Sequence, residues 1–427
     1  MFIEIASSAA MGSFLLYLKF KNENANNDAE KFQRIAANSG LKIKEGTQTR
    51  TIQLLRKTKK AWGTELAYRI PLGLSLDDFE KEKSRFQDGL NNKRGELEFN
   101  FKKLKNLKLD RTIISQLKKI LSKNKGARKE IEFSYDGVLL VKIYNEPLTN
   151  KFLYSDVDRC IGWEVPVGIS RNGQIKHDFD KKAHIIVAGT TDFGKSNWVN
   201  NAIATLIKNN PSEVEFTLID LKGGLEFSPY NSLKQLKTPV ATNEDEALEA
   251  LQSAVDQMEI TMEKLKKKGF KNVKDAGFKK RHFVIIDEAA DIADNKECQE
   301  LLKDIARKGR AAGLRLIYTT QYPTTETISS QVKRNCIGRL CFVLDTSTAS
   351  GVVLDQGGAE KLPLIQGRAL YKDVKLIEVQ TPFISDEEIR EVIRPQINIR
   401  ARKGVRVEEN AIKGDTGNSD TLVIEQA

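Results

Sequence analysis

The sequence is poor in the residues that commonly hold zinc. It contains three histidines and four cysteines among 427 residues. The cysteines, Cys160, Cys298, Cys336 and Cys341, form no C-x-x-C pair and show no metal-like spacing. A zinc site is therefore not expected. This cysteine usage is typical of a protein kept reduced in a cytosolic environment.

A long hydrophobic run is also lacking. Residues 2–20 are mostly apolar and small, but Glu4 interrupts one end, and Lys19 and Lys21 follow at once. A membrane-spanning helix needs about 20 apolar residues, so the run is a little short. We predict a hydrophobic helix that forms a membrane segment over residues 1–21 and places the rest of the chain at the cytoplasmic face of the cell membrane. A docked amphipathic helix or a buried helix is the alternative.

Positive charge, in contrast, is abundant. The formal net charge is +11, with 69 Lys and Arg against 58 Asp and Glu, and the sequence pI is about 9.2. Such a balance suits an anionic partner such as nucleic acid or an acidic membrane surface, although it also serves solubility. The length is sufficient for two or three domains.

One glycine-rich stretch has the pattern of a phosphate-binding loop. The apolar run 185–188 precedes it, and a helical pattern begins at Asn197 and continues through Leu206. In such a loop the backbone N–H groups point at an anion at the positive end of a helix, the lysine reaches the β- and γ-phosphates, and the serine holds Mg²⁺. The predicted ATP-binding residues are Gly189, Thr190, Thr191, Asp192, Phe193, Gly194, Lys195, Ser196 and Asn197.

Further strands and helices alternate after this loop. Strands are predicted at 214–219, 282–286 and 314–320, and a long helix is predicted from an Asn243 cap to Gly269. Alternation of this kind implies a mostly parallel sheet with ligands at the carboxyl ends of the strands. The fold class is thus α/β, and the domain spans 161–395.

Two of these strands end in polar residues suited to ATP hydrolysis. Asp287 and Glu288 end the 282–286 strand, and Gln321 ends the strand that follows. Asp287 is expected to hold Mg²⁺ together with Ser196, and Glu288 to polarise the attacking water. Gln321 is positioned to contact the γ-phosphate, so ATP and Mg²⁺ are the predicted cofactors.

A small α+β domain with a polar linker is predicted over residues 22–160. Its expected elements are a short helix before Gly40, hairpins at 51–70 and 131–144, one helix from Ser75 through Leu90, a strand near 97–101 and a basic helix near 111–123. Its lysines form either a DNA-facing or lipid-facing surface or a solvated one. The tail, 396–427, is polar without periodicity and is expected to be disordered.

A lysine-rich connector links the long helix to the strand that ends at Asp287. Lysines at the end of a helix are explained by the helix dipole, but Lys271, Lys274 and Lys279 lie beyond it. A basic connector with Gly269 and Gly277 is suited to contacts with DNA phosphates that do not depend on the base sequence. These lysines are the DNA-contact candidates, and a solvated connector is the alternative.

Several ordered motifs resemble the FtsK/SpoIIIE-type DNA translocases over residues 168–371. The matching stretches are 188–191, 194–196, Ile219-Asp220 with Lys222, 286–288 with Ala290-Asp291, 308–313, Thr320-Gln321 with Pro323, and 354–362. The resemblance implies a RecA-like motor that forms a hexameric homo-oligomer, hydrolyses ATP and threads duplex DNA through its pore. In related coupling ATPases, a K-G-R-x-A-G segment supplies an arginine to the neighbouring subunit, and a glutamine eleven residues on senses phosphate. The resemblance implies these roles for Arg310 and Gln321, although spacing alone favours a surface arginine at Arg310.

The layout of the chain resembles the FtsK-like coupling ATPases of Gram-positive conjugative elements. This implies transfer of DNA at a membrane, with a relaxase and membrane channel proteins as partners. The sequence departs from the family at Asp192-Phe193 inside the loop, at Ala349-Ser350-Gly351, where many members carry an arginine, and after Pro395, where no winged-helix module is expected. A protein-translocating secretion ATPase and a non-hydrolysing membrane DNA-tethering adaptor remain as alternatives.

Overall fold

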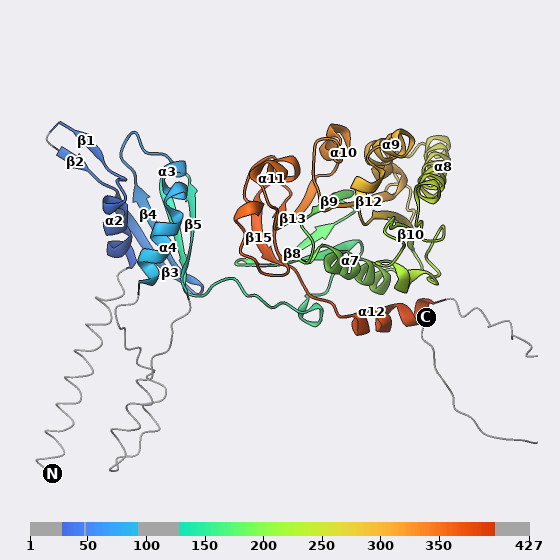
Figure 1. The fold of residues 1–427 in the computed structure, drawn as a ribbon, viewed down its shortest axis with the longest axis horizontal. Coiled ribbons are helices and arrows are strands. Elements are labelled where there is room, and N and C mark those ends of the chain that lie inside the picture. The colour runs from blue at the N-terminus through green and yellow to red at the C-terminus, as the bar shows by residue number, and fades with distance from the viewer. Residues whose placement is uncertain (1–27, 47, 93–127, 398–427) are drawn as a thin grey trace, which may run out of the picture. The chain divides into compact units, whose positions relative to one another are not determined.

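The computed structural model describes residues 28–46, 48–92 and 128–397 (Figure 1). The chain divides into two compact units. The first takes residues up to Asn150 together with Ser170–Gly173, and the second, which we call the P-loop unit, takes the rest. The predicted membrane segment, the strand near 97–101, the basic helix near 111–123 and nearly all of the tail lie outside the described residues. Within the described ranges, no helix has the length and apolar content to span a bilayer.

The first unit contains the two predicted hairpins. They join into one antiparallel sheet with the strand order β3-β4-β6-β5, beside helix α2. A separate two-stranded sheet, β1-β2, was not predicted. The bounds are α2 (Asp28–Asn38), β1 (Ile43–Glu45), β2 (Gln48–Arg50), β3 (Gln53–Lys60), β4 (Gly63–Arg69), β5 (Glu130–Tyr135) and β6 (Leu139–Tyr144).

The single helix predicted after Ser75 is instead two helices, and this expectation was wrong. The predicted capping box between Ser75 and Asp78 is present, but the chain leaves helical geometry at Glu82, with φ −94° and ψ 7°. The two pieces are α3 (Leu76–Lys81) and α4 (Lys83–Asn91). Phe79 and Phe86 lie on either side of the break and are both fully buried, with ring centroids 6.3 Å apart. The apolar spacing is helical on both sides, so the sequence pattern could not reveal the break.

A nine-stranded mixed sheet forms the centre of the P-loop unit, in the order β10-β11-β12-β9-β13-β14-β15-β7-β8. Five neighbouring strands are parallel, as predicted: β10, β11, β12, β9 and β13. The next pairs, β13 with β14, β14 with β15 and β15 with β7, are antiparallel. The bounds are β7 (Glu164–Ser170), β8 (Gly173–Asp178), β9 (His184–Ala188), β10 (Val214–Ile219), β11 (Arg281–Ile286), β12 (Leu314–Thr320), β13 (Gly338–Phe342), β14 (Arg368–Lys372) and β15 (Leu376–Gln380).

Helices cover both faces of this sheet (Figure 1). Side chains of β11 alternate between the two cores: Phe283 and Ile285 pack on the α7 side, and Val284 and Ile286 on the α8 side. Full burial of each such side chain contributes about 1.5–3 kcal/mol. The bounds are α7 (Lys195–Asn209) and α12 (Asp386–Ile393) on one face, and α8 (Glu244–Lys268), α9 (Lys296–Ala312), α10 (Ser330–Asn335) and α11 (Ser347–Leu354) on the other.

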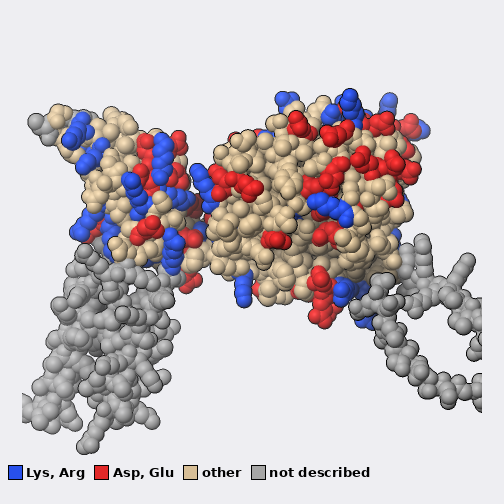
Figure 2. All heavy atoms as spheres, in the orientation of Figure 1, with Lys and Arg blue, Asp and Glu red and all other residues tan. Residues whose placement is uncertain are grey.

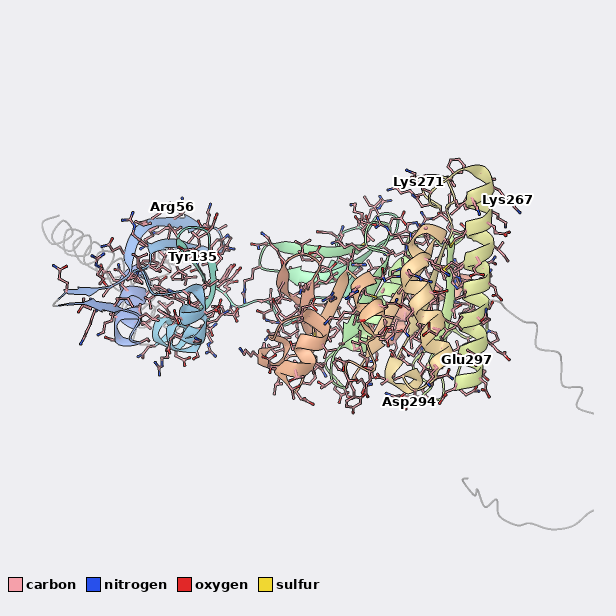
Figure 3. All side chains as sticks on the ribbon, turned by 90° about the horizontal axis from the view of Figure 1, so that it is seen from above. Arg56, Tyr135, Lys267, Lys271, Asp294 and Glu297 are labelled. Carbon is pink, nitrogen blue, oxygen red and sulfur yellow. The ribbon has the colours of Figure 1, made fainter. Side chains whose placement is uncertain are left out.

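The long helix α8 begins and ends as the sequence predicted. The Asn243 side chain accepts a hydrogen bond from the backbone N–H of Glu246, and Gly269 ends the helix with φ 73°. Acidic residues occupy the first turn and lysines the last, which complements the helix dipole. In Figure 3, Lys267 and Lys271 lie at one end of this helix, and Asp294 and Glu297 lie near its other end. The helix thus runs from the carboxyl ends of the parallel strands, where Asp287 lies, to their amino ends, where the connector lies. We call these two sides of the sheet its Asp287 edge and its connector edge.

Candidate nucleotide site

The glycine-rich loop is held between the ends of three sheet segments. It leaves β9, and the Gly189 N–H donates to the Thr320 carbonyl at the end of β12, at 3.2 Å. The Thr190 N–H donates to the Val343 carbonyl just beyond β13, at 3.0 Å. At its far side, the Phe193 carbonyl accepts from the N–H of Gly367, at 2.9 Å. The curve of the loop is therefore fixed by the strands around it.

Two glycines in the loop have no room for a side chain. A Cβ at Gly189 would lie 2.5 Å from the Phe342 Cβ, and one at Gly194 would lie 3.2 Å from the Gly367 nitrogen. Gly194 also has φ 106°, in the left-handed region, as it caps α7. Asp192 adopts φ 68° as a non-glycine residue, and its side chain is exposed. The backbone of the loop is thus curled, and its binding of phosphate oxygens stays a prediction.

Lys195 is buried, and its side chain is directed at Asp287 and Glu288, which follow β11. Its Nζ donates to the Asp287 carbonyl at 2.7 Å and lies 3.5 Å from Asp287 Oδ1 and 3.9 Å from Glu288 Oε2. The side chain is 4% exposed. A buried ammonium requires anionic partners, and a phosphate in the loop would provide further ones.

Glu288 is held rigidly by the strand between it and the loop. Its carboxylate accepts from the Gln321 N–H at 2.9 Å and from Thr320 Oγ1 at 2.7 Å. β12 lies between β9 and β11 in the sheet, so its last residues reach both the loop and the carboxylates. Lys222 adds an ammonium 3.9 Å from Glu288 Oε2. These contacts fix the orientation of the side chain expected to polarise water.

Gln321 contacts the phosphate loop. Its Oε1 accepts a hydrogen bond from Thr191 Oγ1 at 2.9 Å, while its backbone holds Glu288. One residue therefore connects the loop with the expected general base. Its role as a γ-phosphate sensor stays a prediction.

Asn197 was predicted to bind nucleotide, but its side chain is engaged elsewhere. Nδ2 donates to the Ile384 carbonyl at 2.7 Å, and Oδ1 accepts from the Ile384 N–H at 3.2 Å. The pair ties the first turn of α7 to the segment before α12. Ser196, one residue earlier in the same turn, is half-buried.

A third carboxylate near the site was missed in the sequence. Glu226 follows β10, and its carboxylate accepts from Asn200 Nδ2 at 3.0 Å. Burial raises its pKa above the ordinary value, and the charges of Asp287 and Asp220 raise it further, against the hydrogen bond from Asn200 and the charge of Lys195. The sequence signal that could have identified Glu226 was its place in a loop beyond the carboxyl end of a parallel strand, where ligands bind.

Arg310 is not brought to this site. It is exposed in the last turn of α9, and β12, which begins at Leu314, runs from there toward the loop. Burial lowers the pKa of His184 and of Arg315, and the charge of Arg310 lowers both further. Both residues lie near the amino ends of the parallel strands, on the side of the sheet away from the loop. Arg310 therefore cannot contact a nucleotide held by its own Lys195.

The basic connector lies at that same opposite edge. The Val273 N–H donates to the Ala311 carbonyl at 2.9 Å, which ties the connector to the turn carrying Arg310. Lys271, Lys274 and Lys279 are all exposed. On the face drawn in Figure 2, positive and negative side chains of the P-loop unit are interspersed, so net charge alone does not mark a DNA surface.

Comparison with known proteins bears on the same unit. Residues 158–282 match the model of the FtsK/SpoIIIE family. The predicted resemblance to this family is confirmed. The DNA translocase FtsK of Streptococcus pneumoniae (strain ATCC BAA-255 / R6) is 36% identical to the chain over 252 residues, which cover 54% of the chain and 33% of that protein. The chain thus spans about a third of the length of this FtsK/SpoIIIE relative.

Two solved structures share the fold. The pCW3 conjugation coupling protein TcpA, in monomer form with ATPgS, matches 87% of the chain and 99% of its own, with a TM-score of 0.56 and 20% identity. EssC (ATPases 2 and 3) from Geobacillus thermodenitrificans matches 58% of the chain and 51% of its own, with a TM-score of 0.52 and 16% identity. At these identities the likeness concerns the fold.

Proposed function

We propose that the chain is an ATPase that moves duplex DNA as a hexameric ring. The observation that carries the proposal is the convergence of Lys195, Glu288 and Gln321 at one edge of the sheet, with Arg310 and a basic connector at the other. One edge has the groups that hydrolyse ATP, and the other has groups able to act on a neighbouring subunit and on DNA. The match to the FtsK/SpoIIIE model and the FtsK relatives support this choice.

The hydrolytic roles follow from the contacts. The loop N–H groups and Lys195 bind the β- and γ-phosphates of ATP, and Glu288, held by Gln321 and Thr320, accepts the proton of the attacking water. Ser196 and Asp287 would hold Mg²⁺. When bound, this ion would neutralise charge between the β- and γ-phosphates.

The position of Arg310 supports a ring. Because it lies at the edge opposite its own loop, it can stabilise transition-state charge only in the site of a neighbouring copy. A head-to-tail arrangement that closes gives each copy one such contact. The chain is expected to be inactive as a monomer.

Membrane association and conjugative transfer are the finer parts of the proposal. Likeness in fold to a conjugation coupling protein over 87% of the chain supports them, together with the hydrophobic start of the sequence. A relaxase and channel proteins would then be partners at the cytoplasmic face of the membrane. These partners are tested by measuring DNA transfer between cells, once ATP hydrolysis and its stimulation by DNA have been measured.

The first experiment measures ATP hydrolysis with and without long duplex DNA. Strong stimulation is the expected result. Hydrolysis without stimulation would favour a protein-secreting ATPase, and no hydrolysis at all would favour a DNA-tethering adaptor. In either of those cases the proposal of DNA transport is wrong.

The second experiment removes the DNA contacts alone. Replacing Lys271 and Lys274 with Glu should abolish DNA stimulation and leave basal hydrolysis near normal, because both lie at the edge opposite the loop. The slope of log affinity against log salt should fall by about 2, since each phosphate contact contributes about 0.9. The matched control replaces Lys208 and Lys375, which are exposed on other parts of the P-loop unit, with Glu. Equal loss in the control would contradict a role for the connector.

A further inference from the structure

A cavity lies at the connector edge of the P-loop unit, away from the phosphate loop. Its volume is about 460 Å³, and it opens where β10, β11 and β12 begin, beneath the last turns of α8. Pockets of about 300–1,000 Å³ are the usual size for small-molecule ligands. The polar and charged side chains that line it are Glu215, Lys237, Gln257, Thr261, Lys264, Lys279, Lys280 and His282.

The charge of the lining is strongly positive. Four lysines face one carboxylate, Glu215, which lies 2.7 Å from Lys280 Nζ and 3.8 Å from Lys237 Nζ. Lys264 and Lys279 have no ion-pair partner among the residues that the structure describes. The cavity therefore has uncompensated ammonium groups that would bind an anion.

The wall of the cavity also holds a buried polar atom without a partner. His282 is 5% exposed, and its Nε2 lies 2.9 Å from Thr217 Oγ1. Its Nδ1 has no hydrogen-bond partner within the described part of the chain. Leaving a buried polar atom unpaired costs about 1–3 kcal/mol, so such an atom calls for an explanation.

A neutral His282 can present Nδ1 as a donor in one of its two tautomers. Burial lowers its pKa to about 4, with Glu215 raising it and Lys237 lowering it, so the imidazole is neutral at pH 7. When the Thr217 hydroxyl donates to Nε2, the single ring proton is on Nδ1. A neutral N–H beside ammonium groups and the Thr261 hydroxyl is a donor set for phosphate oxygens.

We infer that this cavity binds a terminal phosphate, as in a phosphomonoester or pyrophosphate, through Lys264, Lys279 and His282. A duplex is too wide to enter a cavity of about 460 Å³, whereas a terminal phosphate can enter it. The ligand is thus a free phosphorylated small molecule or a 5′-phosphorylated DNA end. The site is distinct from the proposed ATP site, which lies at the other edge of the sheet.

The experiment titrates inorganic pyrophosphate into the full chain at low ionic strength by calorimetry. Wild type should show two sites, and the Lys195→Ala variant should keep only the cavity site. Lys264→Met should weaken the cavity site about tenfold, the loss expected for one charge-assisted contact. The control is Lys267→Met on the same helix, whose side chain is 78% exposed and outside the cavity, and it should change affinity less than twofold (Figure 3).

The outcomes separate the sources of phosphate. Displacement of pyrophosphate by AMP assigns a free phosphomonoester, and displacement by a 5′-phosphorylated duplex, but not by its dephosphorylated form, assigns a DNA end. Displacement by neither, equal loss in Lys264→Met and Lys267→Met, or a single site in wild type that Lys264→Met leaves unchanged would overturn the inference. If Lys195→Ala fails to fold, loss of one of the two wild-type phases in Lys264→Met still tests it. Failure of ATP hydrolysis alone leaves these results unaffected.

Discussion

The trans role of Arg310 leads to a quantitative mixing experiment. Arg310 precedes β12, whose residues Leu314–Thr320 rise about 3.3 Å each, so about 23 Å of strand separates it from the loop edge. An arginine side chain cannot reach across that length to its own nucleotide. Arg310→Ala should therefore lower kcat by about 10³–10⁵, as expected for loss of an arginine finger.

Two inactive variants should restore each other in a ring. An active interface needs Lys195 in the subunit that holds ATP and Arg310 in its neighbour. Random equimolar mixing of Lys195→Ala and Arg310→Ala chains creates this combination at about one quarter of interfaces, if each interface acts independently. Steady-state ATPase of the mixture should thus approach a quarter of the wild-type rate, while each variant alone stays inactive.

The control mixes each variant with itself after the same dissociation and reassembly. Partial coupling between the sites around the ring would give less than a quarter, but more than either variant alone. Full turnover by Arg310→Ala alone, or a mixture no more active than its components, would refute the trans role.

The remaining predictions concern single side chains. Glu288→Gln should lower kcat by about 10²–10⁴ and keep ATP binding, measured by equilibrium titration, because the amide retains the shape but cannot accept the proton. Gly189→Ala should destabilise the fold by about 1–3 kcal/mol in urea unfolding, since its Cβ would press on Phe342. Burial opposes charge on Asp180, but hydrogen bonds from Arg281 and Arg315 hold its pKa below the ordinary value. Its stabilising effect is therefore present above about pH 4 and lost as pH falls through the folded value. Asp180→Asn should cost about 3 kcal/mol at pH 7 and less at pH 3; an equal cost at both would contradict this.

The parts of the fold set by local pattern could be predicted from the sequence. The strand before the loop and the caps of α8 at Asn243 and Gly269 depend on neighbouring residues, and these expectations are confirmed. Gln321 was predicted from its place at the end of a strand, and the structure brings it to Thr191.

The parts set by long-range packing could not be predicted. The break at Glu82 leaves the apolar spacing unchanged, and the antiparallel strands β14 and β15 extend the sheet through pairings that no local pattern indicates. Glu226 reaches the site through a turn after β10, and there its carboxylate contacts Asn200. That contact joins residues 26 apart in the sequence, so composition and spacing could not locate it.

The length of α8 has a mechanical consequence. Its 25 residues form a rod about 37 Å long between the edge of the sheet that carries the carboxylates and the connector. A rod pivoting at one end works as a lever, and a tilt of about 5° would move its far end by about 3 Å. That displacement is close to the rise of about 3.4 Å per base along one DNA strand. If the connector contacts DNA as proposed, a tilt of this size would advance a phosphate contact by about one nucleotide.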